Sequence, residues 1–294
     1  MSFWESHFLW LEAVIAACAV GAACAVVGAY MILRRVVFLP AALAQVSGLG
    51  VVLAFALPGV LSCAQGAAWA SPEVIAGAVT LVASVSFGWM RTSRTLGRDA
   101  IIGIAYLLAS ALVVVIADGL AAEGHSISDI LFGNAVVVGT GQMFVAVIVA
   151  AVVLAMHAVF MRPFLFVSFA PQTATAHGVP VRLLDTLLFV TVGVTIAVAT
   201  KTIGAMPVFA FAVIPAAAAL QAFSDMRWVL MCAAAIGAAS AFLGYWLSFV
   251  AAVPTGPSMA LVTVLFFVPT AAIGRAVQKR SLSKACPHCG CQGP

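Results

Sequence analysis

The densest cluster of metal-ligating residue types lies near the end of the chain, in the segment Cys286-Pro-His-Cys-Gly-Cys291. Cys286, His288, Cys289 and Cys291 offer thiolate and imidazole groups, which zinc and copper(I) prefer as ligands. The tail lacks the second cysteine pair of a closed structural zinc site. Two tails of a dimer would complete such a site; the alternative is a disordered tail whose cysteines are incidental. We therefore expect no cofactor on this chain apart from zinc at this Cys/His cluster.

Groups that could power transport are nearly absent from the rest of the sequence. A phosphate-binding G-x-x-x-x-G-K-[ST] loop is missing, because Lys201, Lys279 and Lys284 all lack a preceding glycine. Ion-driven carriers usually hold several carboxylates or histidines within the membrane. The apolar segments here contain almost none, chiefly Glu12 and His157, for which interfacial hydration and packing are the simpler roles. An energy source on another chain is the economical inference, and we expect no enzymatic activity on this one.

The composition excludes a water-soluble fold. Of 294 residues, 65% are apolar and only 7% are charged, whereas a typical soluble domain is about half apolar and a quarter charged. The net charge of +4 comes from too few cations to form a nucleic-acid groove, so we expect membrane lipid and no nucleic acid as a partner. Because residues 1–7 contain no Lys or Arg, the first apolar run is expected to stay as an anchor rather than to be cleaved.

The apolar residues gather in runs that can each cross a bilayer core of about 30 Å. One run exceeds a single span and contains the interruption Lys201-Thr-Ile-Gly204, which divides it into two spans or into one span and a re-entrant piece. We predict an all-α polytopic helical bundle with nine membrane spans, and eight as the alternative. The runs are Phe8–Leu33, Phe38–Ser62, Val74–Met90, Ala100–Ala117, Met143–Met161, Thr186–Phe223, Val229–Val253 and Ser258–Gly274.

Small residues recur at four-residue spacing in the first of these runs and in the one that begins at Val229. Such stripes let helices approach closely in lipid, where packing drives their association, so they predict a compact bundle. The residues are Ala13, Ala17, Gly21 and Ala25, and then Ala233, Gly237 and Ala241.

Loop charges predict the orientation, since Lys and Arg next to spans are retained on the cytoplasmic side. With nine spans and the N-terminus outside, every loop cation falls inside except Lys201. We therefore predict a multi-pass protein of the inner (plasma) membrane. Its transmembrane domain would cover residues 1–277, followed by a short cytoplasmic Cys-rich tail, residues 278–294.

Several segments, in the same order along the chain, resemble the zinc/manganese/iron ABC-transporter permeases, the ABC-3 family. Residues 31–50 resemble the segment in which paired arginines precede a Gly-Asp-Ala-Leu-Ser-His-Ala type motif. The resemblance covers roughly residues 9 to 275. Its further landmarks are Arg98–Gly103, Ile130–Asn134, Phe169–Pro180, Ile203–Ala217 and Pro254–Pro257.

This resemblance implies a homodimeric permease that binds two cytoplasmic ATPase subunits and receives its cargo from an extracytoplasmic metal-binding protein. Residues 169–180, including Phe169, Pro171, His177 and Gly178, would contain the segment that couples the permease to the ATPase. An ordinary interfacial loop is the alternative for this stretch. Ala170 stands where the family usually has an acidic residue, so the helix expected here lacks an Asp cap.

The resemblance also indicates where cargo would cross, and there the sequence departs from the family. The family places an Asp and a His one helical turn apart, where both can face a passing cation; here these positions are Ala41 and Gln45. Gln45 and Ser47 can hydrogen-bond to a neutral or chelated solute, or instead join helices. Lys201 either bonds to carbonyl groups at a helix end or gates the outer mouth.

Together these features predict the permease subunit of an ATP-driven importer for a divalent transition metal (Zn, Mn or Fe) or its complex. A stand-alone carrier or channel for a neutral or apolar solute is the alternative. A transport-inactive membrane scaffold is a third reading, which the lost Asp and His would favour.

Overall fold

The computed structural model describes residues 7–56, 71–90, 97–119 and 138–285, with side chains described from residue 10 to residue 270 of these ranges. Within them every regular element is a helix, which confirms the predicted all-α bundle. The long helices are α1 (His7–Leu33), α2 (Leu39–Ala56), α3 (Pro72–Trp89), α4 (Arg98–Gly119), α6 (Thr140–Val159), α9 (Val181–Ile203), α10 (Ala205–Ala222), α11 (Met226–Ala251) and α12 (Thr255–Ala285). Two short helices, α7 (Met161–Phe169) and α8 (Pro171–Ala176), join α6 to α9.

The number of membrane-length helices agrees with the predicted eight or nine. Eight helices of the described ranges, α1 to α4, α6 and α9 to α11, are long and apolar enough to cross a membrane. The ninth, α12, has a shorter apolar part, Thr255–Thr270, and continues to Ala285. The predicted boundary at residue 277 falls within α12.

The overlong apolar run forms two helices, which is one of the two arrangements predicted from the sequence. α9 ends and α10 begins at Gly204, whose φ of 88° and ψ of 164° lie in a region that glycine adopts far more readily than other residues. The chain therefore reverses direction within one residue, and no re-entrant piece is needed.

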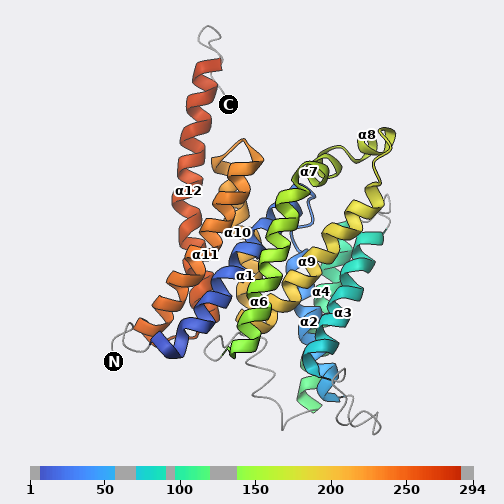
Figure 1. The fold of residues 1–294 in the computed structure, drawn as a ribbon, viewed down its shortest axis with the longest axis vertical. Helices are drawn as coiled ribbons and strands as arrows, with labels where there is room; N and C mark the ends of the chain where they lie inside the picture. Colours follow the sequence, from blue (N-terminus) through green and yellow to red (C-terminus); the bar gives the residue numbers. More distant parts are fainter. Residues whose placement is uncertain (1–6, 57–70, 91–96, 120–137, 286–294) are drawn as a thin grey trace.

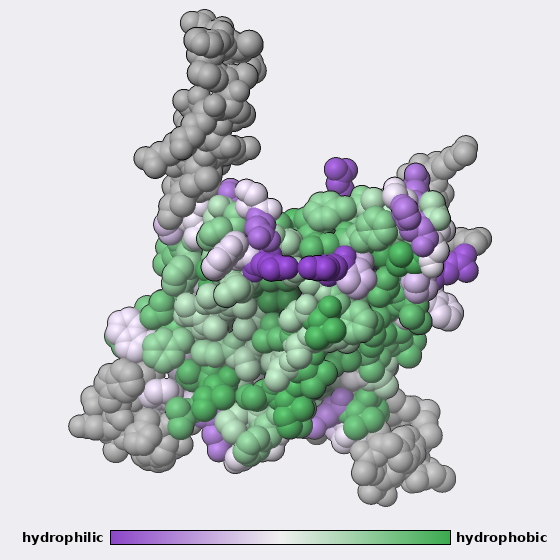
Figure 2. Space-filling model, turned by 45° about the horizontal axis from the view of Figure 1, so that its top comes forward, coloured by the Kyte–Doolittle hydropathy of each residue, from purple (hydrophilic) through white to green (hydrophobic). Residues whose placement is uncertain are grey.

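The long helices run alternately up and down, so the bundle has two distinct ends (Figure 1). α1 finishes at the same end of the bundle as α8, and we call this end the α8 end. The N-terminal end of α1 and the turn between α9 and α10 lie at the opposite end. A broad band of apolar residues crosses the face shown in Figure 2, with hydrophilic residues mainly above it and at its lower edge. This is the surface expected of a bundle embedded in lipid.

The small-residue stripes bring α1 into close contact with α11. A Cβ atom added to Gly237 would lie 2.5 Å from the carbonyl oxygen of Gly21, so neither position has room for a side chain. Gly28 is tighter still, since a Cβ there would lie 1.6 Å from the carbonyl oxygen of Ala212 in α10. The predicted compact packing is confirmed, and α1 lies at its centre between α10 and α11.

His157 packs inside the bundle, the role that the sequence favoured for it. Its side chain is buried, and its Nδ1 lies 2.9 Å from the carbonyl oxygen of Val153 one turn earlier. The ring lies 5.1 Å from the ring of Tyr30 and 5.3 Å from that of Phe164, measured between centroids. His157 therefore joins α1, α6 and α7.

Candidate functional site

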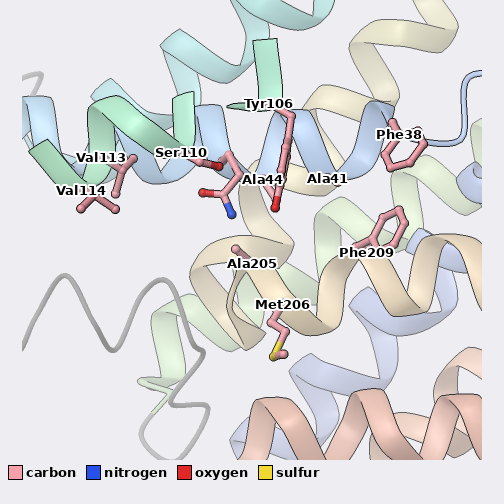
Figure 3. Close-up of a pocket in the computed structure, with 11 residues that line it drawn as sticks. Phe38, Ala41, Ala44, Tyr106, Ser110, Val113, Val114, Ala205, Met206 and Phe209 are labelled. Atoms are coloured by element: carbon pink, nitrogen blue, oxygen red, sulfur yellow. The ribbon is translucent and has the colours of Figure 1, made fainter. Parts of the chain in front are cut away.

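A cavity of about 520 Å³ lies between α2, α4 and α10, and Ala41 and Gln45 both line it. Because these two residues are one helical turn apart on α2, they face the same side. Figure 3 shows the cavity wall, in which Tyr106 extends from α4 into the space between α2 and α10. The lining residues are Phe38, Ala41, Ala44, Gln45, Tyr106, Ser110, Val113, Val114, Ala205, Met206 and Phe209.

The chemistry of this cavity is that of neutral donors and acceptors. None of its lining residues is charged; the polar atoms come from the Gln45 amide and from the hydroxyl groups of Tyr106 and Ser110. The Ser110 Oγ is buried and has no hydrogen-bond partner among the described residues. Met206 adds a thioether, which is a soft but weak ligand. The cavity can hydrogen-bond to a solute of moderate size, but it offers no anionic ligand to a bare cation.

Ser47 does not line this cavity and lies instead with Lys201. The two residues share a second cavity of about 350 Å³ towards the opposite end of the bundle, between α2, α3, α6 and α9. Ser47 follows Gln45 by two positions, which turns it to another side of α2. The structure thus divides the four path candidates into two pairs, Ala41 with Gln45 and Ser47 with Lys201.

Lys201 pairs with Glu73 across the second cavity. Its Nζ forms an ion pair with Oε1 of Glu73, which lies in the first turn of α3, and the two side chains are 35% and 57% exposed. An adjacent cavity of about 260 Å³ shares both residues and Gln142. Sequence reasoning did not pair Lys201 with Glu73, although the opposite charges of these two residues at the same predicted end could have suggested it.

The segment Phe169–Pro180 forms a short protrusion at the α8 end (Figure 1). Phe169 is 68% exposed, and Pro171, His177 and Gly178 are exposed as well, whereas Ala174 is the buried residue of α8. As predicted, Ala170 supplies no side-chain cap to α8. Gly178 has a φ of 75°, so it turns the chain from α8 towards α9 in a conformation that favours glycine.

Side-chain contacts hold the protrusion at both of its ends. The ring of His177 lies 6.2 Å from the ring of Phe166 in α7, between centroids. Arg34, just after α1, donates from Nε to Ser168 Oγ at 3.0 Å and from Nη1 to Asp185 Oδ1 at 2.5 Å. Since Ser168 lies in the last turn of α7 and Asp185 lies near the start of α9, Arg34 joins the two helices that flank α8.

Sequence reasoning missed this link. Arg34 was recognised only as a loop cation and as part of the paired-arginine segment, and Ser168 and Asp185 were not singled out. The Arg34 and Asp185 side chains are 8% and 22% exposed. The sequence nonetheless contained a signal for an ion pair. Asp185 is an acidic residue at the start of a span on the cation-rich side, and such residues usually pair with a cation.

The Cys/His cluster of the tail, Cys286, His288, Cys289 and Cys291, lies outside the described residues. Within the ranges that the structure describes, no group of three or more His, Cys, Asp or Glu residues could hold a metal ion. Zinc at the tail remains a prediction.

The chain matches the model of the ABC 3 transport family over residues 6–274. The chain belongs to this family. It is 30% identical over 256 residues to a "Manganese transport system membrane protein MntC" from Halalkalibacterium halodurans, a match that covers 87% of this chain and 84% of that protein. The family resemblance expected from the ordered motifs is thereby confirmed.

Solved structures of ABC transporters share the fold. "PsaBC from Streptococcus pneumoniae in complex with Fab" matches with a TM-score of 0.78 and 25% identity, over 94% of this chain and 96% of that one. "An inward-facing conformation of a putative metal-chelate type ABC transporter" matches with a TM-score of 0.70 and 18% identity, over 92% and 89% of the two chains, and supports the fold alone. This member of the ABC 3 family is thus a multi-pass membrane permease subunit rather than an enzyme.

Proposed function

We propose that this permease imports a divalent transition metal, zinc, manganese or iron, in the form of a complex that keeps its own ligands. The observation that carries the proposal is the neutral cavity around Ala41 and Gln45. A divalent cation that enters the membrane must exchange its water for other ligands, and carboxylate or imidazole groups are the usual ones. A cavity without them suits a cargo whose charge is already neutralised.

The polar groups of the cavity fit such a cargo. The Gln45 amide can donate and accept, and the Tyr106 and Ser110 hydroxyls can do both. These groups would hydrogen-bond to the outer atoms of a chelate, while Phe38, Phe209 and the neighbouring aliphatic residues exclude water. The volume of about 520 Å³ accommodates a small complex.

The energy would come from cytoplasmic ATPase subunits that press on the Phe169–Pro180 protrusion. Because Arg34 joins α7 to α9, a push on α8 would move both helices together and rock the bundle around the cavity. A second copy of this chain would complete the channel, and an extracytoplasmic metal-binding protein would deliver cargo at the opposite end. The arginines at the α8 end support a cytoplasmic position for that end and for the C-terminus.

The ion pair between Lys201 and Glu73 would close the outer end. It joins α9 to α3 beside the two smaller cavities, so its rupture would let these helices separate. This role extends the gating alternative that the sequence left open for Lys201.

Reconstitution tests the proposal. Liposomes that contain the permease with its ATPase subunits and binding protein should concentrate manganese or zinc. They should do so only when ATP is present on the side of the membrane where the ATPase subunits lie. Uptake of the citrate complex should exceed uptake of the aquo ion at the same total metal. Concentration of solute by this chain alone would instead support the stand-alone carrier, and faster uptake of the aquo ion would refute a chelated cargo.

A further inference from the structure

A third cavity, of about 680 Å³, lies at the α8 end between α3, α4 and α9, away from the proposed path. Its wall includes Trp89, Arg98, Arg182, Leu183, Asp185 and Thr186. Arg98 is the first residue of α4, and Arg182 is the second of α9. Two arginines from separate helices thus face one cavity at the edge of the apolar band.

Positive charge dominates this cavity. Asp185, the carboxylate in its wall, is already bound by Arg34 at 2.5 Å. Asp99 follows Arg98, but its Oδ1 lies 3.4 Å from the backbone N–H of Phe38, at the other side of the α4 start. The charges of Arg98 and Arg182 therefore exceed what the nearby carboxylates neutralise.

The Arg98 guanidinium is held in place, but its donors are not all used. Arg98 donates from Nη2 to the carbonyl oxygen of Met90 at 3.0 Å, and its guanidinium lies 5.5 Å from the centroid of the Phe189 ring. Its Nε is buried without a hydrogen-bond partner among the described residues. The exposed Arg182 side chain makes no ion pair within the described part of the chain. A guanidinium fixed in this way is prepared to bind an oxyanion.

Apolar side chains beside the arginines indicate where the oxyanion comes from. Trp89 is 73% exposed and Leu183 is 66% exposed, and both line the cavity. The indole N–H of Trp89 donates to Thr186 Oγ1 at 2.9 Å, which fixes the ring at this level. Tryptophan is typical of the membrane–water interface, where headgroups and acyl chains meet.

We infer that this cavity binds the phosphate group of an anionic phospholipid in the leaflet at the α8 end. Arg98 and Arg182 receive the phosphate oxygens, and the acyl chains lie against Trp89 and Leu183. Basic pockets between membrane helices have the charge and the depth to select such headgroups. The bound lipid would join α4 to α9 next to the Arg34 link, independently of which cargo the permease carries.

Native mass spectrometry and lipid exchange test this inference on the full-length chain. Purified protein in neutral detergent, offered equimolar phosphatidylglycerol and phosphatidylcholine, should retain phosphatidylglycerol preferentially. Arg182→Gln and Arg98→Gln should each reduce that retention by about tenfold, as expected for the loss of one charge-assisted contact. Arg227→Gln, which removes an exposed arginine from the start of α11 at the same end, should leave retention unchanged.

Three results would overturn the inference. The first is equal retention by the wild type and both cavity variants, provided that their thermal unfolding shows them to be folded. The second is retention of phosphatidylcholine as strong as that of phosphatidylglycerol. The third is displacement of the lipid by millimolar inorganic phosphate, together with binding of phosphate alone that Arg182→Gln weakens as it weakens lipid retention. The ligand would then be a soluble phosphate rather than a lipid.

Discussion

Under the proposed function, two positions on α2 would determine what this permease can hold in the cavity between α2, α4 and α10. Ala41 and Gln45 have the spacing and the common orientation that a cation site would need, but neither carries the necessary chemistry. If this cavity holds the cargo, a few side chains on α2, rather than a different fold, would select it.

Replacement of these two residues should convert the site into one for a bare cation. The double variant Ala41→Asp and Gln45→His places a carboxylate and an imidazole one turn apart. We expect uptake of aquo manganese or zinc to rise on the order of tenfold, which is the scale on which ligand shells alter metal affinity. Cellular metal content measures the effect. The matched control, Ala41→Ser with Gln45→Asn, adds no such ligands, and an equal rise in this control would disprove the explanation.

Loss of the ion pair between Lys201 and Glu73 should open the second cavity, the one that Ser47 lines, more often. A partly exposed pair contributes about 1 kcal/mol or less, so we expect up to about a fivefold change. The measurement is the rate at which an impermeant maleimide labels Ser47→Cys, a position in that cavity. Lys201→Gln should accelerate labelling and Lys201→Arg should not. Identical labelling rates with Lys201, Lys201→Gln and Lys201→Arg would show that the ion pair has no role in gating.

At the scale of helices, the α7–α8–α9 unit depends on Arg34. Asp185→Asn leaves a largely buried guanidinium without its carboxylate, which should lower the free energy of unfolding by about 1–3 kcal/mol. The same change should reduce the ATP-dependent transport of the reconstituted complex, since α7 and α9 no longer move as one. Ser86→Ala, which removes only a local bond to the carbonyl oxygen of Val82 within α3, is the control and should alter neither quantity.

Close contact between α1 and α10 sets a second requirement on the helices. Gly28→Ala forces a methyl group against the carbonyl of Ala212 and should destabilise the bundle by about 1–3 kcal/mol, as overpacking does. Gly77→Ala in α3 provides the comparison, because a Cβ there meets no atom within 4 Å. Thermal unfolding in detergent should distinguish the two variants, and equal midpoints would contradict the packing account.

The sequence predicted the helices better than it predicted their partners. Long apolar runs located the long helices, and the spacing of small residues predicted close packing, but not that Gly21 would meet Gly237. By contrast, α7 was not expected as a separate helix, although Pro163 in its first turn is a signal for a helix start. The bonds of Arg34 to Ser168 and Asp185 join residues more than 130 positions apart, so no local pattern shows which cation binds Asp185.

At the scale of the whole molecule, the two ends of the bundle differ in charge. Among the residues whose side chains are described, the arginines lie at the α8 end, at the termini of α1, α4, α7, α9 and α11, whereas Lys201 lies at the opposite end beside Glu73. This asymmetry predicts the orientation in the membrane, because cationic loops are retained on the cytoplasmic side. In that orientation the protrusion around α8 would face the compartment that holds ATP.

Labelling of single cysteines in intact cells tests this orientation. Thr173→Cys lies on the exposed α8, and Gly141→Cys lies at the start of α6, at the opposite end, where an added side chain meets no other atom. An impermeant maleimide should label Gly141→Cys directly but should reach Thr173→Cys only after the membrane is permeabilised. Labelling of Thr173→Cys from outside would mean that the protrusion faces outward, beyond the reach of any cytoplasmic ATPase. The proposed coupling mechanism would then be excluded.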